Sequence, residues 1–419
     1  MLKNKRILTL LFLLLFLRPQ AQTLTLDSVR AIIAREHPAL SMYEYEIRSM
    51  DEAANGARSW MAPEVSSGFW MAPYNVKRWK KDEEGMPGMG QYMIGVQQMI
   101  PSRKAQNAEY AYMRSMSSVE RERQGAVRND LFSEAQKQYV DAVAITRKLA
   151  VVAADEKLLE YMIKDAELRF RNGMDKLSAY YKAKAALGNL QSMRVMLESE
   201  LEQAKFRLNT LMNRAPATPV STDTFILLQD PRRYTIDSAT LLQRSDVRAL
   251  DRGIEVTKLR QQFERSSLRP TFGIRYEHMT GFGGQPAQFT LMGMMRIPFA
   301  RWSARMNRAA ISSLEWKTQA LRQEKIMMTN EMLGMASRMR SELTAKQKQV
   351  QLLEHNILPA LKKNYETMLL GYSHNTEELF MLFDAWETLY MTQLEHLEQW
   401  RQQGRLQAEL EQILQINRQ

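Results

Sequence analysis

Cysteine is absent from the 419 residues of the sequence. The chain therefore has no disulfide, no thiolate metal ligand and no cysteine to carry a lipid anchor. Histidine is scarce as well: the five histidines include no pair at metal-ligand spacing, and no HExxH motif occurs. A GxSxG nucleophile elbow and a glycine-rich phosphate loop after a strand are also missing. These absences argue against an enzyme and against a bound cofactor.

Long hydrophobic runs are missing too, apart from a short one near the N-terminus. Lys3, Lys5 and Arg6 precede an apolar run from Ile7 to Leu17. That run is shorter than the roughly 20 residues that a spanning helix needs, and with its basic start it predicts a secretory signal peptide over residues 1–22. We therefore expect the chain to leave the cytoplasm and, if it crosses a membrane, to do so without helices.

Acidic residues do not balance the basic ones, and the formal net charge of +11 raises the question of nucleic acid binding. The basic residues are scattered among acidic ones along predicted helix faces. No helix-turn-helix, zinc-finger or RNA-binding signature accompanies them. We therefore expect no nucleic acid partner.

Two halves of the sequence match each other. The segment LTLDSVRAIIAREHPAL (24–40) aligns without gaps to YTIDSATLLQRSDVRAL (234–250), and further matching blocks follow in the same order. The segment NRAPATPVSTD, rich in proline, serine and threonine, separates the halves. This order predicts duplicated helix-strand-strand-helix-helix halves. The predicted parts are a signal peptide (1–22), a first repeat (23–213), a linker (214–233) and a second repeat (234–419).

Proline is missing between Ser102 and Ala215, a stretch in which apolar residues keep a heptad spacing. The spacing predicts coiled-coil helices paired as hairpins over 102–213 and 302–417. A helix from 102 to about 172 would measure roughly 105 Å at 1.5 Å per residue, longer than any globular core. Two arrangements fit this pattern: an antiparallel hairpin with imperfect packing, or a wide ring of helices that faces water inside.

Four short stretches alternate polar and apolar residues instead. In RPTFGIRYEH (269–278), the side chains of Phe272, Ile274 and Tyr276 fall on one face of an extended chain. Tilted strands of about eight to ten residues are long enough to cross a bilayer. The four predicted strands cover residues of about 64–72, 90–100, 270–279 and 287–298.

A sheet in a membrane cannot keep an open edge, because each unpaired backbone group in hydrocarbon costs several kcal/mol. Four strands cannot close a barrel, since the smallest known barrels have about eight, but three copies of the chain would supply twelve. We therefore predict an oligomeric β-barrel that continues into a tube of long helices. A soluble four-stranded sheet packed on helices is the alternative.

Several motifs together resemble the TolC family of bacterial outer-membrane efflux channels. They are LTLD with HPAL, the strand-ending QMIPSR and RIPFAR, and ILPALKKNYETMLLGY, and the resemblance covers about residues 23–417. The segment GMPGMGQYMIGVQQMIPSRK is similar to the branch found with heavy-metal exporters. The family's fold is mainly α with a small β part. It is a trimeric 12-stranded transmembrane β-barrel in the outer membrane, continued by a long periplasmic α-helical coiled-coil barrel.

The resemblance implies a passive channel that catalyses nothing and is held in outer-membrane lipid. It implies a homotrimer that works with a periplasmic adaptor protein and an inner-membrane pump. It also implies that the adaptor contacts two helix-turn-helix tips, while it identifies no gate residue. Gly173 and Gly371 are expected to adopt the positive φ that ends a helix. The predicted tip residues are Arg171, Asn172, Gly173, Met174, Asp175 and Leu177, and Gly371, Tyr372, Ser373, His374, Asn375 and Thr376.

Methionine is abundant, with 29 residues. Met86, Met89 and Met93 lie beside one predicted strand, and thioethers are soft ligands suited to Cu(I) or Ag(I). Methionine can equally replace leucine in helices and on lipid-facing positions, and Met327 and Met328 on one helix favour that interpretation. A copper/silver or other heavy-metal efflux duct is therefore a narrower alternative to a general efflux or secretion duct. The main rival of another class is a secreted or periplasmic coiled-coil scaffold without a pore.

Overall fold

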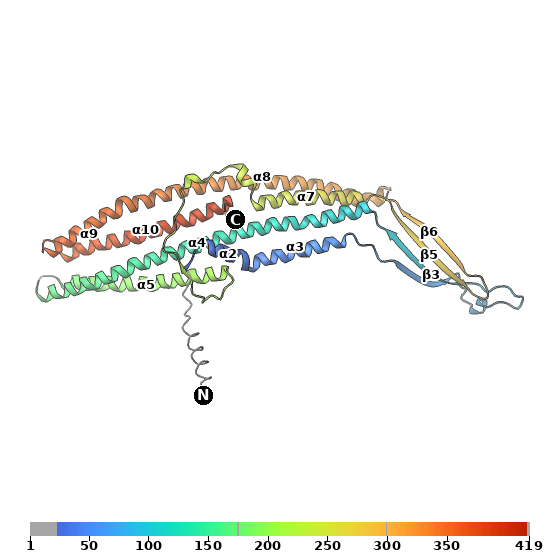
Figure 1. Cartoon of the computed structure of the whole chain (residues 1–419), viewed down its shortest axis with the longest axis horizontal. Helices are drawn as coiled ribbons and strands as arrows, with labels where there is room; N and C mark the ends of the chain where they lie inside the picture. Colours follow the sequence, from blue (N-terminus) through green and yellow to red (C-terminus); the bar gives the residue numbers. More distant parts are fainter. Residues whose placement is uncertain (1–22, 174–175, 299, 417–419) are drawn as a thin grey trace, which may run out of the picture. The chain divides into compact units, whose positions relative to one another are not determined.

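Helices make up most of the computed structural model of the chain, which describes residues 23–173, 176–298 and 300–416. A four-stranded sheet and a two-stranded one accompany them (Figure 1). The prediction of a mainly α fold with a small β part is confirmed. The predicted signal peptide lies outside the described residues, as do two of the predicted tip residues, Met174 and Asp175.

The chain divides into two compact units. Two long helices, α4 (Arg103–Arg171) and α8 (Arg301–Leu352), contribute residues to both of them. The chain therefore passes from one unit to the other four times. Unit 1 comprises the described residues within 1–42, 125–244 and 329–419, and unit 2 comprises those within 43–124 and 245–328.

Unit 2 holds the four-stranded sheet, which is antiparallel throughout and has the strand order β2-β3-β5-β6. The alternating, β-branched and aromatic-rich segments found in the sequence form these strands. Most of α3 (Pro38–Gly56), all of α7 (Ser245–Ser266) and parts of α4 and α8 complete the unit, with a short 3-10 turn at Val76–Trp79. The strands are β2 (Glu64–Trp70), β3 (Gln91–Ile100), β5 (Thr271–Gly281) and β6 (Gln288–Arg296).

Unit 1 is almost entirely helical. Many of its heptad-spaced apolar residues are buried: Val152 and Leu159 of α4 pack in one core with Leu190 of α5 and with Leu382 and Trp386 of α10. Among the described residues, no helix combines the length and the apolar composition required to span a membrane. The helices that lie wholly in this unit are α2 (Leu26–Glu36), α5 (Leu177–Leu211), α6 (Ser238–Leu242), α9 (Leu358–Ser373) and α10 (Leu379–Leu414).

The start of the described chain and the linker are held together in unit 1. Strand β1 (Thr23–Leu24) pairs in parallel with β4 (Ser221–Thr222). The hydroxyl of Tyr139 on α4 donates a hydrogen bond of 2.7 Å to the carbonyl of Leu24 and accepts one of 3.0 Å from the amide of Asp223. Burial raises the pKa of Tyr139 to about 12, so the phenol stays protonated and keeps donating. This one side chain therefore ties β1 and the residue that follows β4 to α4.

A π-helical turn at Leu353–Ile357 joins α8 to α9 without a loop. Pro359 stands in the first turn of α9. Its nitrogen cannot donate a backbone hydrogen bond, and its ring would collide with the carbonyl four residues earlier in a regular helix. The wider π turn accommodates the proline and lets the two helices follow one another.

Candidate functional site

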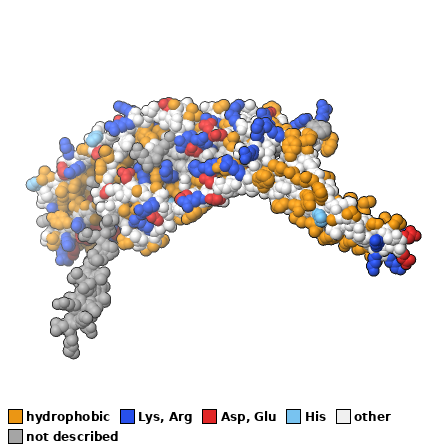
Figure 2. Space-filling view, turned by 45° about the vertical axis from the view of Figure 1, so that its right-hand side comes forward, with side chains coloured by type: hydrophobic (Ala, Val, Ile, Leu, Met, Phe, Trp, Pro, Cys, Tyr) orange, Lys and Arg blue, Asp and Glu red, His pale blue; other side chains and the backbone are white. Residues whose placement is uncertain are grey.

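One face of the sheet in unit 2 is apolar and exposed. Tyr276 of β5 is the register partner of both Val96 of β3 and Leu291 of β6, so the three side chains stand side by side. They are 45%, 41% and 66% exposed, respectively. Hydrophobic side chains cover this part of the molecule in Figure 2. The other exposed apolar side chains of this face, called here the apolar face, are Val65, Phe69, Tyr92, Ile94, Ile100, Phe272, Ile274, Phe289 and Met295.

The opposite face, called here the polar face, carries charged and amide side chains. Gln97 is the register partner of Glu64 on one side and of Arg275 on the other, and its amide donates a hydrogen bond to the Glu64 carboxylate. Arg275 forms an ion pair with Glu277, which is only 7% exposed. Opposite Glu277 stands Gly95, where a β-carbon would lie 3.2 Å from Cγ of Glu277. Glycine at this position leaves the room that the carboxylate side chain occupies.

The β2–β3 and β5–β6 loops pack against each other in unit 2. The ring of Trp79 stacks on Phe282, with ring centroids 4.8 Å apart and planes 4° from parallel. Phe69 lies against Trp79 at a centroid distance of 5.3 Å. The amide of Gly88 donates a hydrogen bond of 3.2 Å to the carbonyl of Gly283. Aromatic packing and backbone hydrogen bonds therefore join two loops that are far apart in the sequence.

The first helix-turn-helix tip joins α4 to α5 in unit 1. Helix α4 ends at Arg171, and Gly173 follows with a φ of 71°. The expected positive φ at Gly173 is confirmed, and the amide of this residue donates a hydrogen bond of 2.9 Å to the carbonyl of Phe170. The side chains of Arg171, Asn172 and Leu177 are exposed, so they are accessible to a partner.

The second tip joins α9 to α10 and corrects one expectation. Gly371 lies inside α9 without a positive φ, and Asn375 is the residue in the left-handed region, with a φ of 58°. The amide of Thr376 donates to the carbonyl of Gly371 at 2.9 Å, and that of Asn375 to the carbonyl of Tyr372 at 3.1 Å. This pair of bonds is a Schellman motif, which asparagine can complete because it tolerates the left-handed region. The expectation that Gly371 ends the helix is therefore wrong. The exposed side chains of this tip include Ser373, His374, Asn375 and Thr376.

A polar cluster ties α4 to the second tip. The hydroxyl of Tyr372 donates a hydrogen bond of 2.8 Å to Oδ2 of Asp165. Arg169 forms an ion pair with the same oxygen at 3.2 Å and donates to the side-chain oxygen of Asn375 at 2.6 Å. The Arg169 guanidinium also lies over the Tyr372 ring, 4.0 Å from its centroid. We call Asp165, Arg169, Tyr372 and Asn375 the tip cluster.

Sequence reasoning found only half of the tip cluster. It named Tyr372 and Asn375 as tip residues and missed Asp165 and Arg169. The one local signal was the spacing of four residues between Asp165 and Arg169, which suits an ion pair on a helix. Arg169 also lies in the last turn of α4, where a basic side chain is favourable. The partner of that pair lies 207 residues further along the chain, where no local pattern can reveal it.

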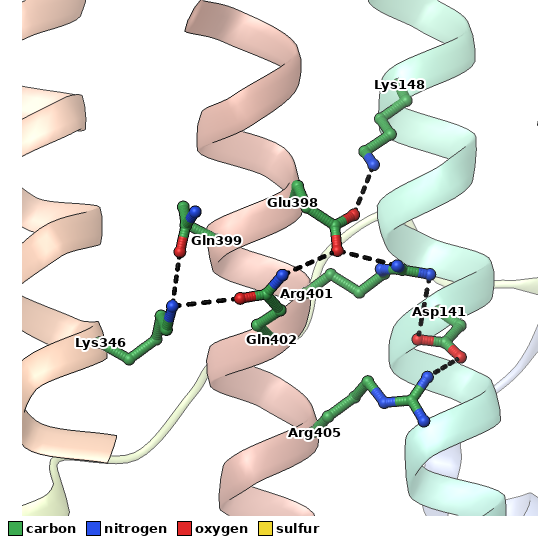
Figure 3. Close-up of polar contacts among 8 residues, drawn as sticks. All are labelled: Asp141, Lys148, Lys346, Glu398, Gln399, Arg401, Gln402 and Arg405. Carbon is green, nitrogen blue, oxygen red and sulfur yellow. Dashed lines mark hydrogen bonds and ion pairs between the residues drawn. The ribbon is translucent and has the colours of Figure 1, made fainter. Parts of the chain in front are cut away.

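A second polar network lies where α10 packs beside α4 in unit 1 (Figure 3). Glu398 accepts hydrogen bonds from Lys148 at 2.7 Å and from Arg401 at 2.8 Å. Asp141 pairs with Arg405 at 2.9 Å and lies 3.9 Å from Arg401. Cations and carboxylates therefore alternate along the contact between the two helices.

Helix α8 joins this network through Lys346, which donates to the side chains of Gln399 at 2.7 Å and Gln402 at 3.1 Å (Figure 3). Burial acts to raise the pKa of Glu398, but the hydrogen bonds from Arg401 and Lys148 outweigh it and lower that pKa to about 2. The Glu398 carboxylate is therefore charged at neutral pH and keeps both of its cationic partners.

The sequence-based metal hypothesis concerns residues of unit 2. Met86 and Met89 lie in the β2–β3 loop, 59% and 54% exposed, and Met93 lies half-buried on the polar face. In the part of the chain that the structure describes, no group of three or more His, Asp or Glu side chains is arranged to hold a metal ion. Any metal site on these residues would therefore depend on methionine sulfur.

Solved structures of outer-membrane channels have the same architecture. The solved structure of CusC, which concerns conformational changes in folding and transmembrane channel formation, is similar to this chain with a TM-score of 0.74 and 14% sequence identity. The similarity covers 94% of this chain and 92% of CusC. VceC from Vibrio cholerae has a TM-score of 0.72 and 14% identity, covering 93% and 95%. The open-state MtrE channel from Neisseria gonorrhoeae has a TM-score of 0.70 and 14% identity, covering 93% and 88%. A search with protein-family profiles and a search of curated protein sequences find no match. Similarity at these identities establishes the fold.

Proposed function

We propose that this chain, which has the fold of the TolC-family outer-membrane efflux channels, is the outer-membrane channel of a tripartite efflux or secretion system. In that role it is a passive conduit for export across the outer membrane and the periplasm, and it catalyses no reaction. The observation that carries the proposal is the apolar face, whose side chains are 38–70% exposed on a sheet with a polar opposite face.

The exposure of the apolar face supports lipid over water as its surroundings. Burying one such side chain fully stabilises a protein by about 1.5–3 kcal/mol. Leaving a dozen of them half in water forgoes on the order of 10 kcal/mol, which is comparable to the whole free energy of unfolding of a typical domain. A soluble scaffold without a pore would carry that cost, whereas a hydrocarbon layer removes it. Lipid is therefore the solvent that fits this face.

The two edges of the sheet support assembly from several copies. In the described part of the chain, β2 and β6 each pair with only one neighbouring strand. Unpaired edges are not tolerated in hydrocarbon, so the edge β6 of one copy must pair with the edge β2 of the next. Closed rings of identical chains satisfy this requirement, and three copies give a barrel of twelve strands. We propose a homotrimer whose polar faces line the barrel and whose helices form a coiled-coil barrel in the periplasm.

The duplicated organisation fits this assembly. The signal peptide at 1–22 directs export, and the repeats at 23–213 and 234–419 each supply two strands and one helical hairpin, joined by the linker at 214–233. We propose that the two hairpin tips are the surfaces that a periplasmic adaptor protein contacts, while an inner-membrane pump supplies the energy. The contact residues in the first tip are Arg171, Asn172, Gly173, Met174, Asp175 and Leu177. Those in the second are Gly371, Tyr372, Ser373, His374, Asn375 and Thr376.

Two measurements on the full-length, exported protein test the proposal. After extraction of outer membranes with detergent, we expect a trimer that dissociates only on heating. In planar lipid bilayers, the purified trimer is expected to give step-like increases in conductance. Recovery of the exported chain as a monomer in plain buffer would overturn the proposal and favour the scaffold.

The tip assignment has its own test. Cysteines placed at the exposed positions Asn172 and His374 allow crosslinking in cells, since the native chain contains no other cysteine. We expect a crosslinked adaptor with either variant. A cysteine at Glu202, which is exposed on α5 away from the turn, is the matched control and is expected to give no adaptor product. Equal products from all three positions would contradict the assignment.

A further inference from the structure

The methionines of the four-stranded sheet gather on its polar face. The strands contain six methionines, and the apolar face has only one of them, Met295. Met295 is the register partner of Phe272, which places it on the apolar face. The other five alternate with apolar-face residues along β3, β5 and β6. They are Met93, Met99, Met279, Met292 and Met294.

The composition of the two faces shows that these methionines are not replacements for leucine. The polar face contains no Val, Ile, Leu or Phe in any of the four strands; Trp70 is its one other large apolar side chain. Valine, isoleucine, leucine and phenylalanine all stand on the apolar face instead. If methionine served only as a flexible hydrophobe, it would be expected among them. What distinguishes methionine from those residues is its polarisable thioether sulfur.

Four of these methionines form two pairs. Met93 of β3 is the direct register partner of Met279 of β5. Cross-strand partners on one face have their β-carbons about 4.5–5.5 Å apart, which brings side chains as long as methionine into contact range. Both side chains are half-buried. We call Met93 and Met279 the first thioether pair.

The second thioether pair, Met99 and Met294, approaches across a glycine. Gly273 of β5 is the register partner of Met99 on β3 and of Met294 on β6. A β-carbon at Gly273 would lie 2.6 Å from Sδ of Met99 and 3.2 Å from Cε of Met294. No other residue could stand between the two thioethers without displacing them. The glycine therefore creates the space in which both methionine side chains lie.

Arg275, Glu277 and Glu64 of the polar face are engaged with one another or with an amide, and the thioethers are the neutral, soft ligands of this face. Arg275 is paired with Glu277, so the positive charge nearest the middle of the face is compensated. Glu64 is engaged by the amide of Gln97. A hard divalent cation needs several carboxylate oxygens, and the described residues offer no group of three. Neutral thioethers suit instead a soft ion of low charge, of which Cu(I) and Ag(I) are the examples.

We propose that the polar face binds soft monovalent metal ions, Cu(I) or Ag(I), at the pairs Met93–Met279 and Met99–Met294. The inference rests on the proposed function, because there the polar face lines the conduit, and it names a cargo class for that conduit. Two neutral ligands hold such an ion weakly enough to release it, as conduction through successive sites requires. The sequence-based set Met86, Met89 and Met93 shares Met93 with the first pair, and Met86 and Met89 are exposed in the loop that leads into β3.

The test uses Ag(I), added as silver nitrate in a buffer without chloride or thiols, because Ag(I) needs no reductant. The probe is full-length protein in detergent whose methionine methyl groups carry carbon-13. We expect Ag(I) to shift a small group of methyl resonances at lower concentrations than it shifts that of Met306, a lone methionine that is 85% exposed. If no resonance shifts before that of Met306, the inference is overturned.

Variants then assign the shifted resonances. Met93→Leu with Met279→Leu should remove one set, and Met99→Leu with Met294→Leu the other, since leucine conserves volume but lacks sulfur. Met295→Leu, one residue from Met294 on the opposite face, is the matched control and should retain every early-shifting resonance. Persistence of those resonances in the variant with all four replacements would refute the two pairs.

A conductance measurement separates this inference from the proposed function. In planar bilayers bathed in potassium nitrate, Ag(I) should reversibly lower the current through the wild-type channel and leave the current through the fourfold variant unchanged. A channel that conducts potassium normally but shows no response to Ag(I) in either assay would refute metal binding and leave the channel function standing. If the protein gave no conductance, the channel proposal would fail, while the methyl resonances would still decide whether the pairs bind Ag(I).

Discussion

The hydroxyl of Tyr372 at the second tip donates a 2.8 Å hydrogen bond to the carboxylate of Asp165 on α4. Tyr372 is 6% exposed, whereas the side chain of Asp165 is 31% exposed, so the bond lies at the edge of the packed part of unit 1. Asp165 also pairs with Arg169, which in turn holds Asn375 of the turn. The tip cluster therefore joins the turn between α9 and α10 to the end of α4.

Tyr372→Phe tests that role. The variant removes the hydroxyl and keeps the ring under the Arg169 guanidinium, so it should weaken the tip by about 0.5–1.5 kcal/mol, the net value of one hydrogen bond. We expect faster amide hydrogen exchange in the last turns of α4 and α9. Tyr161→Phe, at a site on α4 that is 69% exposed, is the matched control and should leave the exchange rates unchanged. Unchanged exchange at both helix ends in Tyr372→Phe would contradict the role of the tip cluster.

The two tip glycines should respond differently to alanine. Gly173 has a φ of 71° and no atom within 4 Å of a β-carbon built on it, so Gly173→Ala meets only backbone strain, of about 1–2 kcal/mol. At Gly371 the backbone is helical, and alanine instead meets Cγ of Glu377 at 2.6 Å. We expect Gly371→Ala to regain helical stability once Glu377 is shortened to alanine as well, whereas no second substitution should rescue Gly173→Ala. Hydrogen exchange of the last turn of each helix measures the stability in every variant. If Glu377→Ala also restored the stability of Gly173→Ala, the predicted difference between the two glycines would be contradicted.

The contrast between these glycines shows where sequence reasoning reaches its limit. A glycine after a heptad run is a sound signal for the end of a helix, and at Gly173 it was right. At Gly371 the same signal failed, because Asn375 completes a Schellman motif and the helix continues to Ser373. Both residues tolerate positive φ, and Asn375, which adopts it, accepts a hydrogen bond from Arg169 of another helix, a contact that no local pattern contains.

The four-stranded sheet shows which structural features can be predicted from the sequence. Alternation at Phe272, Ile274 and Tyr276 predicts a strand because the two-residue period is a property of the strand itself, and β5 covers these residues. The pairing of β3 with β5 joins residues from the two halves of the chain, so it could not be read from either half alone. The methionine pairs depend on that pairing, and for this reason the sequence pointed to Met93 without its partner Met279.

Glu398 makes the stability of unit 1 depend on pH. Its pKa is about 2 in the folded chain against an ordinary value of 4.5, because hydrogen bonds from Arg401 and Lys148 outweigh the effect of burial. A carboxyl with a lowered pKa stabilises the fold fully above its unfolded pKa and loses that contribution as the pH falls through its folded pKa. With the Glu398 side chain 27% exposed, the contribution is about 3 kcal/mol, and it should disappear between about pH 4.5 and pH 2.

Glu398→Gln measures that contribution. The difference in free energy of unfolding between the wild type and this variant should be largest at pH 7 and should shrink as the pH falls below about 4.5. Glu202→Gln is the control, since its exposed ion pair with Lys205 should be worth at most about 1 kcal/mol at any pH. Urea unfolding of the purified protein in detergent at several pH values provides both curves. A difference for Glu398→Gln that stayed constant down to pH 2 would show that the charge of Glu398 does not stabilise the network.

Neighbouring residues on opposite faces of β3 offer the sharpest test of which face meets lipid. Val96 stands on the apolar face beside Tyr276, and Gln97 on the polar face beside Glu64. A lysine near the middle of a lipid-facing strand costs about 2–4 kcal/mol. We therefore expect Val96→Lys to reduce the yield of heat-resistant trimer in outer-membrane extracts strongly. Gln97→Lys should assemble normally, because its ammonium group gains the Glu64 carboxylate as a partner and would face water in the proposed barrel. Because the two substitutions are the same and lie one residue apart, general effects of an added charge cancel. If Gln97→Lys blocked assembly and Val96→Lys did not, the faces would be reversed, and the methionines of the polar face would lie in lipid.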